Sequence, residues 1–475
     1  MNNNVRNSFS KTLLAISIAS VSSVTQAASF GLIEHSASGQ GAAFAGAAAI
    51  GEDASTIFFN PAAMTRLSGQ QIVLAGHIIS PDAKFKDDGS FAVDAIAGVP
   101  ATLTGGDSST GDPAFVPNFY YSAELDNDVF VGVGVNVPFG LSTEYDNGWR
   151  GRYHALRSEI SSININPSIA WKATDKVSVG FGLSIQYMEL ELTNNIDSYN
   201  ACASIVAGGG GNPAATCPAV GLTGPSDATK DSHLKLDGDS TEIGWNAGIL
   251  IDVTNKDRIG IAYRSAIKHD VSGDADYTLD PGLQMVADGA SSPPPTGSGF
   301  NILQDTPLSA VAELPESFAV SYVRDIDSQW TFLADWTWTG WSSLETITII
   351  QEGGIPGAEP TLDLDYANSN RYSIGVHYKP NNKWIYRGGL ALDETPIRSA
   401  EQTTARIPGS DRTWLSFGVG YAPAADWSLD FGYSHLFISD TRINSNTGSS
   451  SSGATLTGDY ESSVDILSAQ VNFNF

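Results

Sequence analysis

The last nine residues of the chain, Leu467-Ser468-Ala469-Gln470-Val471-Asn472-Phe473-Asn474-Phe475, alternate strictly between apolar and polar side chains. Because successive side chains of a β-strand point to opposite faces, this stretch predicts a strand with one apolar and one polar face. The strand stops on an aromatic residue at the end of the chain, which favours a membrane barrel over a soluble sheet. In a barrel the apolar face contacts lipid and the polar face points into the lumen.

The composition also favours a barrel over a bundle of transmembrane helices. Charged residues make up only 16% of the chain, aromatic residues reach 10%, and the mean hydropathy is close to zero at -0.08. Beyond the N-terminus there is no run of about 18 apolar residues, which excludes helical spans. The net charge of -27 argues against nucleic acid as a partner and is explained by acidic, solvated loops.

Residues 1–27 are predicted to be a signal peptide. Positive charge at Arg6 and Lys11 precedes a short apolar run, Leu13–Val24, and a small-residue cleavage site, Thr25-Gln26-Ala27. We therefore expect export to the outer membrane of a Gram-negative cell. A terminal Phe475 resembles the signal that the barrel assembly machinery reads there, so this machinery and outer-membrane lipid are expected partners.

Strand-like alternation recurs up to the C-terminus and predicts fourteen strands. The count is even, as single-chain bacterial barrels require. The predicted fold is therefore all-β, a 14-stranded antiparallel transmembrane β-barrel over residues 70–475. The strands are expected near 70–80, 115–124, 129–140, 156–173, 177–193, 235–253, 258–273, 316–325, 329–349, 369–379, 383–395, 411–422, 427–440 and 461–475.

The links between these strands alternate strictly between short and long. Short periplasmic turns and long outer loops are the rule for such barrels, which places both barrel ends on the periplasmic side. Cys202 and Cys217 fall in one long link, where they can form a disulfide, although the sequence leaves their pairing open. The long links are expected at 81–114, 141–155, 194–234, 274–315, 350–368, 396–410 and 441–460.

Residues 28–69 precede the first strand and lack its alternation. The stretch from Ser38 to Gly51 is almost wholly small residues, which suits a compact plug packed inside a barrel. Asn60 can cap a helix, and Pro61 suits its first position. A flexible tail is the alternative, but a solvated tail would not need aromatic residues such as Phe58.

Taken in order along the chain, several motifs resemble FadL-type long-chain fatty-acid and hydrophobic-compound transporters of the outer membrane. No motif is decisive alone, but together they span the mature chain. They are Ala28-Ser29-Phe30-Gly31-Leu32, Asn60-Pro61-Ala62, Val137-Pro138-Phe139-Gly140-Leu141, Arg152-Tyr153-His154-Ala155, Tyr263-Arg264-Ser265, Leu314-Pro315-Glu316, Asp411-Arg412 and Asn472-Phe473.

The resemblance implies a lumen closed by an N-terminal plug, called the hatch, and sideways exit of cargo through a gap at a kink in the third strand. It assigns the hatch gate to Phe58, Phe59, Asn60, Pro61 and Ala62. The kink is assigned to Pro138, Phe139, Gly140 and Leu141. Proline lacks the N–H that strand pairing needs, so it can open a gap in the wall, although the alternative is that the strand simply ends there.

The resemblance also bears on the cargo. Fatty-acid members are expected to meet the carboxylate with an Arg and a Lys, but the matching positions here hold Asn194 and Thr348. Candidate headgroup contacts are therefore Arg152, His154, Asn194 and Thr348, with Arg264, Arg371 and Arg398 as further candidate cations. Both long-chain fatty acids and neutral or aromatic hydrocarbons stay open as cargo.

The expected function is passive uptake of hydrophobic molecules by a monomer without cofactor or metal. A general diffusion porin is the alternative, and it would keep an open aqueous lumen without a plug. A lipid-acting enzyme of the outer membrane is a less favoured alternative, because no serine lies in a recognisable nucleophile context. A siderophore-type plugged barrel would need a larger plug and about twenty-two strands.

Overall fold

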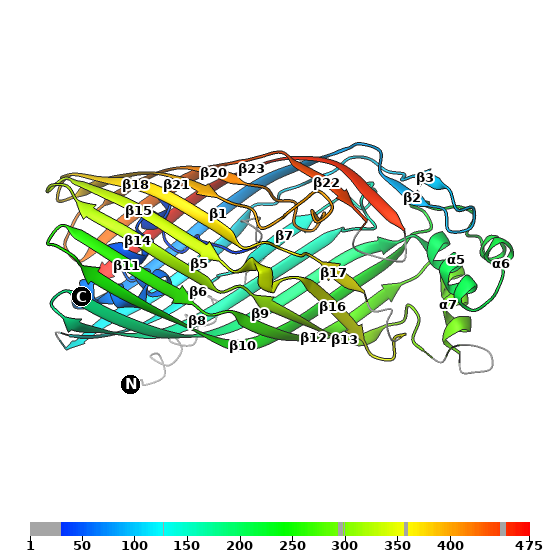
Figure 1. Cartoon of the computed structure of the whole chain (residues 1–475), viewed down its shortest axis with the longest axis horizontal. Helices are drawn as coiled ribbons and strands as arrows, with labels where there is room; N and C mark the ends of the chain where they lie inside the picture. The colour runs from blue at the N-terminus through cyan, green and yellow to red at the C-terminus, as the bar shows by residue number, and fades with distance from the viewer. Residues whose placement is uncertain (1–29, 127, 293–297, 299, 356–359, 447–452) are drawn as a thin grey trace, which may run out of the picture.

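The computed structural model describes residues 30–475 except 127, 293–297, 299, 356–359 and 447–452, and these residues form a closed antiparallel β-barrel with a plug (Figure 1). The predicted signal peptide, residues 1–27, lies outside the described residues. Antiparallel pairing of Gln71–Asp87 with Gly458–Asn474 closes the barrel. The prediction of an all-β, fourteen-stranded barrel is confirmed.

Each barrel strand pairs with its neighbours in chain order. Several barrel strands are interrupted, so that one barrel strand consists of two labelled elements. In order they are β1 (Gln70–Asp87), β5 (Ala114–Asp126), β6 (Val129–Asn136) with β7 (Gly140–Glu144), β8 (Arg157–Thr174), β9 (Val177–Ile196), β10 (Ser232–Asp252), β11 (Asp257–Arg264) with β12 (Ile267–Thr278), β13 (Thr306–Leu314) with β14 (Ser317–Asp325), β15 (Trp330–Thr339) with β16 (Thr346–Gln351), β17 (Thr361–Asp363) with β18 (Ser369–Asn381), β19 (Trp384–Asp393), β20 (Arg412–Tyr421), β21 (Trp427–Ile438) with β22 (Thr441–Ser445), and β23 (Ala454–Asn474).

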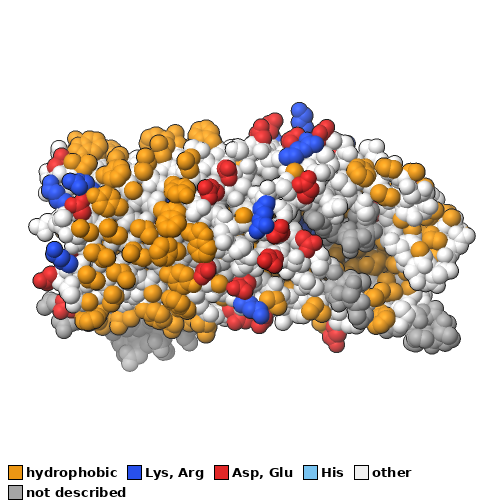
Figure 2. Space-filling view, viewed as in Figure 1, with side chains coloured by type: hydrophobic (Ala, Val, Ile, Leu, Met, Phe, Trp, Pro, Cys, Tyr) orange, Lys and Arg blue, Asp and Glu red, His pale blue; other side chains and the backbone are white. Residues whose placement is uncertain are grey.

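The alternation in β23 sets the position of the apolar belt. Leu467 is exposed on the outer surface, while Ser468 and Gln470 are buried in the lumen. On the loop side of Leu467 the pattern inverts, because Asp465 faces outward and Ile466 inward. Figure 2 shows the same change over the whole face: apolar side chains cover the half of the barrel with the short turns, and charged side chains lie beyond it.

The hatch consists of short helices, α2 (Ala37–Gln40), α3 (Ala47–Ile50), α4 (Thr56–Phe59) and η1 (Pro61–Arg66). They lie inside the short-turn half of the barrel, drawn in dark blue in Figure 1. The hatch approaches the wall closely at glycines, where a Cβ would come within 1.9–2.6 Å of hatch atoms. These wall glycines are Gly180, Gly248, Gly260, Gly389 and Gly418.

The outer loops fold into a cap over the other end of the barrel. It contains β2 (Phe91–Val93), β3 (Pro100–Thr102), β4 (Ser109–Thr110), α5 (Ser198–Gly208), α6 (Pro213–Ala219), α7 (Pro281–Ser291) and η2 (Trp341–Ser343). A disulfide between Cys202 and Cys217 joins α5 to α6. In the part of the chain that the structure describes, every helix is too short or too polar to cross a membrane.

Candidate functional site

The third barrel strand is broken at Pro138. β6 ends at Asn136 and β7 begins at Gly140, and both pair with β8. Between them, the Phe139 N–H donates to Ser162 Oγ at 3.0 Å, and Ser162 Oγ donates to the Phe139 carbonyl at 2.7 Å. The Ser162 side chain thus replaces the backbone hydrogen bonds between the strands at this point. On the other side, β5 pairs with β6 only from Phe119 onward.

The first hatch residues fill the place that the broken strand leaves. The Leu32 N–H donates to the Pro138 carbonyl at 2.9 Å, and the Gly140 N–H donates to the Phe30 carbonyl at 2.8 Å. The next turn of the hatch contacts β5, where Asn118 Nδ2 donates to the Glu34 carbonyl at 2.9 Å. The segment Phe30–Glu34 therefore contacts both the broken strand and the neighbouring strand β5.

Asn60 fixes the hatch to itself and to the wall. Its Nδ2 donates to the Ala48 carbonyl at 2.7 Å and to the Ile249 carbonyl of β10 at 3.1 Å, while its Oδ1 accepts the Ala62 N–H at 3.0 Å. All polar atoms of this side chain are thereby used. Pro61 begins η1 directly after it, as the helix-start pattern in the sequence predicts.

The two phenylalanines of the hatch form an aromatic cluster with His35. The Phe58 ring lies 3.5 Å from the His35 ring and 5.3 Å from the Phe59 ring, centroid to centroid. The Arg264 guanidinium of β11 lies 4.2 Å from the Phe58 ring centroid, and its Nη2 donates to the Phe58 carbonyl at 2.9 Å. The cluster joins the hatch to the wall of the barrel.

A cavity of about 180 Å³ lies between this cluster and the broken strand. It brings the predicted gate residues Phe58 and Phe59 together with the predicted kink residues Pro138 and Phe139. Its remaining lining combines apolar and charged side chains: Leu32, Ile33, Tyr263, Arg264, Trp341, Arg371, Asp393 and Trp414. Leu141 is buried in an apolar cluster with Phe139 and Trp341.

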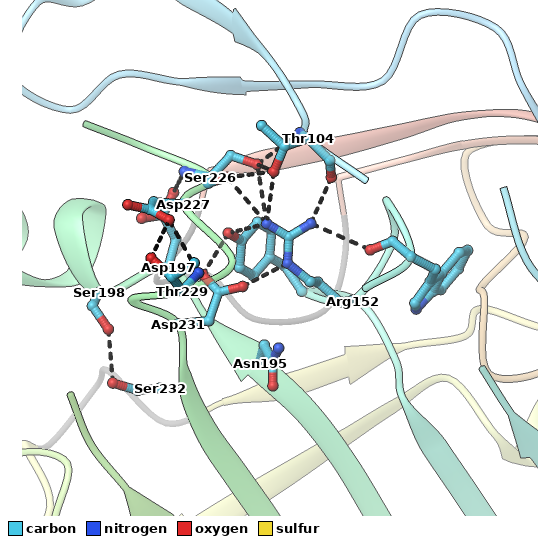
Figure 3. Close-up of polar contacts among 12 residues, drawn as sticks. Thr104, Arg152, Asn195, Asp197, Ser198, Ser226, Asp227, Thr229, Asp231 and Ser232 are labelled. Atoms are coloured by element: carbon cyan, nitrogen blue, oxygen red, sulfur yellow. Dashed lines mark hydrogen bonds and ion pairs between the residues drawn. The ribbon is translucent and has the colours of Figure 1, made fainter. Parts of the chain in front are cut away.

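The predicted headgroup contacts lie elsewhere. Arg152 is fully buried in the cap, where its Nε donates to Asp231 Oδ2 at 2.5 Å, its Nη1 to the Thr104 carbonyl at 2.6 Å and its Nη2 to the Tyr153 hydroxyl at 2.9 Å (Figure 3). The arginine thus joins three outer loops. Asp197 belongs to the same network, and burial raises its pKa to about 6.

The other three predicted contacts also lie outside the cavity. His154 is buried beside Arg152 in the cap, and Thr348 is exposed on β16. Asn194 is buried, and its Oδ1 accepts from Arg406 Nη2 at 3.1 Å. Sequence reasoning missed Arg406, because this residue belongs to a loop more than two hundred residues away and no local pattern links it to Asn194.

A closed barrel with a plug, an apolar belt and a broken third strand defines a class of outer-membrane transport proteins. The chain belongs to the family described as outer membrane protein transport protein (OMPP1/FadL/TodX), whose model matches residues 18–475. It is therefore an outer-membrane protein.

Three comparisons illustrate this membership. The chain is 28% identical to a long-chain fatty acid transport protein of Escherichia coli O6:H1 over 90% of this chain and 91% of the relative. It is 29% identical to outer membrane protein P1 of Haemophilus influenzae over 90% of each chain. A crystal structure of a Pseudomonas aeruginosa FadL homologue superimposes with a TM-score of 0.84 at 25% identity, over 94% of this chain and 100% of that one.

Proposed function

We propose that this protein is a passive uptake channel for hydrophobic molecules, with capture at the outer loops and sideways exit at the broken third strand. The observation that carries the proposal is the pairing of Phe30–Leu32 with Pro138–Gly140. Because hatch residues close the gap in the wall, movement of the hatch and opening of the wall become one event. Binding that favours the displaced hatch shifts the population toward the open wall and needs no energy source or catalytic group.

The charged periplasmic end of the lumen supports sideways exit. At the periplasmic end, Arg387 bridges hatch and wall, with Nη2 at 3.2 Å from Glu52 Oε2 and Nη1 at 2.7 Å from Asp430 Oδ1. An apolar molecule gains about 0.8 kcal/mol per buried methylene, so such a charged region opposes its passage. In this proposal, cargo instead leaves through the wall gap into the lipid around the barrel.

A reversible tether tests this mechanism. In a Gly31→Cys, Phe139→Cys variant, oxidation would join the hatch to the broken strand across their bridge. We expect oxidation to abolish uptake of a fluorescent fatty acid into liposomes, and a reductant to restore it. A Gln71→Cys, Asn474→Cys pair on the barrel seam serves as the control tether, and wild type controls for reduction of the native disulfide.

Normal uptake by the oxidised Gly31–Phe139 tether would contradict exit at this gap. Large, steady conductance of the wild-type protein in planar bilayers would instead support a general porin. The toluene transporter of Ralstonia pickettii has the same fold, with a TM-score of 0.62 at 18% identity over 92% of this chain and 98% of that one. Uptake of fatty acids, the cargo in the name of the Escherichia coli relative, should therefore be compared with uptake of aromatic hydrocarbons.

A further inference from the structure

One outer loop turns inward and crosses the lumen. In the link between β19 and β20, all residues from 403 to 409 are buried, although connecting loops normally lie at the surface. A tight turn shapes this segment, because the Ile407 N–H donates to the Thr404 carbonyl at 3.2 Å. We call residues 403–409 the strap.

The strap reaches the wall opposite its own strands. Arg406 Nη1 donates to Ser158 Oγ of β8 at 3.0 Å, and Arg406 Nη2 donates to Asn194 Oδ1 of β9 at 3.1 Å. The strap follows β19, the eleventh barrel strand, whereas β8 is the fourth. Strands seven apart in a ring of fourteen lie diametrically opposite, so the strap spans the lumen from wall to wall.

Along the barrel axis, the strap lies between the outer loops and the hatch. Ala405 belongs to an apolar cluster of the outer loops that includes Trp149. Two residues further on, Ile407 belongs to the cluster of Phe139, which lines the cavity between hatch and wall. The strap therefore lies on the way that cargo captured at the outer loops would take to this cavity.

The strap is also bound to the second half of the broken third strand. Thr143 Oγ1 of β7 donates to the Arg406 carbonyl at 3.2 Å, and the Tyr145 hydroxyl, just after β7, donates to the Ala405 carbonyl at 2.7 Å. The hatch binds the same strand a few residues earlier, at Pro138. The two segments that fill the lumen are thus attached to one broken strand.

Uncharged contacts hold the strap on the wall. Among the described residues, Arg406 donates to a hydroxyl, an amide oxygen and backbone carbonyls such as that of Thr193. Displacing the strap therefore leaves no buried charge behind, in contrast to the pair of Arg152 with Asp231 in the cap. A buried cation with uncharged acceptors is poorly compensated, so hydration of its guanidinium favours the displaced strap.

We propose that the strap is an outer gate, which closes the lumen between the outer loops and the cavity and admits cargo when it is displaced. This inference rests on the proposed uptake function and adds a second moving segment on the side opposite the hatch. Its two states are in equilibrium, so the bonds from Thr143 and Tyr145 set how often the gate is open.

A reporter thiol measures the gate without requiring uptake. Both cysteines of the chain are joined in the disulfide, so Thr339→Cys on β15, in the cavity lining, adds a single free thiol. Whole cells that carry this variant are treated with a charged, membrane-impermeant thiosulfonate, and the labelling rate is measured. Adding Thr143→Val and Tyr145→Phe removes both side-chain hydrogen bonds to the strap backbone. We expect labelling to accelerate about tenfold or more, since each lost hydrogen bond shifts the population about fivefold.

The matched control for the loosened strap is Tyr433→Phe in the same reporter background. This hydroxyl donates to Asp465 at 2.7 Å on the outer surface, so its loss should leave the labelling rate unchanged. Folding of each variant is checked by heat-dependent migration in gels.

A reversible lock provides a second, independent arm. In Tyr145→Cys, Ala405→Cys, a short thiol cross-linker that a reductant cleaves would join the strap to the broken strand. We expect the lock to abolish uptake of a fluorescent fatty acid into liposomes and the reductant to restore it. The seam pair Gln71→Cys, Asn474→Cys is the control lock, and wild type controls for reduction of the native disulfide.

Equal labelling of the loosened variant and its parent, or normal uptake with the strap locked, overturns the outer gate. If wild type shows no uptake while labelling still depends on Thr143 and Tyr145, the gate stands and the proposed cargo route fails.

Discussion

The hatch and the outer cap are both buried regions, but they are held in opposite ways. In the hatch, small residues bring backbone against backbone, as where Ala48 faces Gly260 and Gly41 faces Gly418. In the cap, a fully buried Arg152 is paired with Asp231, and a disulfide joins two helices. Close backbone packing predominates in the hatch, whereas a buried ion pair and a disulfide stabilise the cap.

Because of this difference, we expect the hatch to move more easily than the cap. Each small hatch residue buries little apolar surface, so displacing it loses many weak contacts, and the contact of Glu52 with Arg387 is the charged exception. Moving the cap would leave Asp231 buried without its cation, which is far less favourable. We therefore expect rearrangement in the hatch beneath a cap of fixed structure.

The largest effect is expected from Arg152→Met in the cap. Removal of one partner of a buried ion pair destabilises by about 3–5 kcal/mol, because Asp231 stays buried. Hydrogen exchange of the cap amides near Asp197 and Ser226 should accelerate accordingly. Arg442→Met is the control, since this exposed arginine pairs with Asp88 and Asp459 at the surface and should leave exchange unchanged. Equal exchange in both variants would show that the cap does not depend on the pair.

A smaller effect is expected from Gly389→Ala on β19. The added Cβ would lie 2.2 Å from the Ala42 carbonyl carbon, so the hatch must move, at about 1–3 kcal/mol. Conductance in planar bilayers should rise. Gly388→Ala is the matched control, because a Cβ there meets nothing within 4 Å. If the two variants conduct alike, the wall glycines do not hold the hatch.

The smallest effect, taken per pH unit, is a pH dependence of the cap. Burial raises the pKa of Asp197 to about 6, so the folded cap holds a proton that the unfolded chain releases between pH 4 and 6. Cap stability should therefore fall as pH rises through this window, by up to about 1.4 kcal/mol per pH unit, and level off above it.

Asp197→Asn should flatten this slope, since an amide oxygen can still accept the N–H groups of Tyr199 and Asn200. Burial also raises the pKa of Asp231, so a residual slope is expected. The measurement is hydrogen exchange of the cap from pH 4 to 7, corrected for the intrinsic rate. A variant as steep as wild type would assign the dependence to another group.

The sequence predicts what repeats locally and misses what depends on distant contacts. Alternation placed all the barrel strands, because every strand in the apolar belt has one lipid face. It ended strands too early on the loop side, as at Thr278, since beyond the belt acidic residues such as Asp465 face outward and the pattern inverts. It also missed β13 and the helices of the cap.

The candidate site also contains residues that local sequence predicts and residues whose contacts it does not predict. Asn60-Pro61 and Pro138 follow from local backbone chemistry, and the structure brings Phe58 and Pro138 to one cavity. The partners of Arg152 and Asn194 belong to other loops, and no local pattern in the sequence specifies them. Whether Phe58 and Asn60 act as the gate stays a prediction that the tether experiment addresses.

The seam between β1 and β23 has a consequence for assembly. Gln71 pairs with Asn474, so the closing strands lie about 400 residues apart in the sequence. Pairing of these two strands therefore carries the entropy cost of closing that long loop. The hatch precedes β1 and contacts strands as late as β21 and β23, as where the Ala37 N–H donates to Gln470 Oε1. β23 is synthesised last, and its pairing completes both the wall and a contact between wall and hatch. The order of synthesis therefore favours a barrel that closes around a hatch already in place.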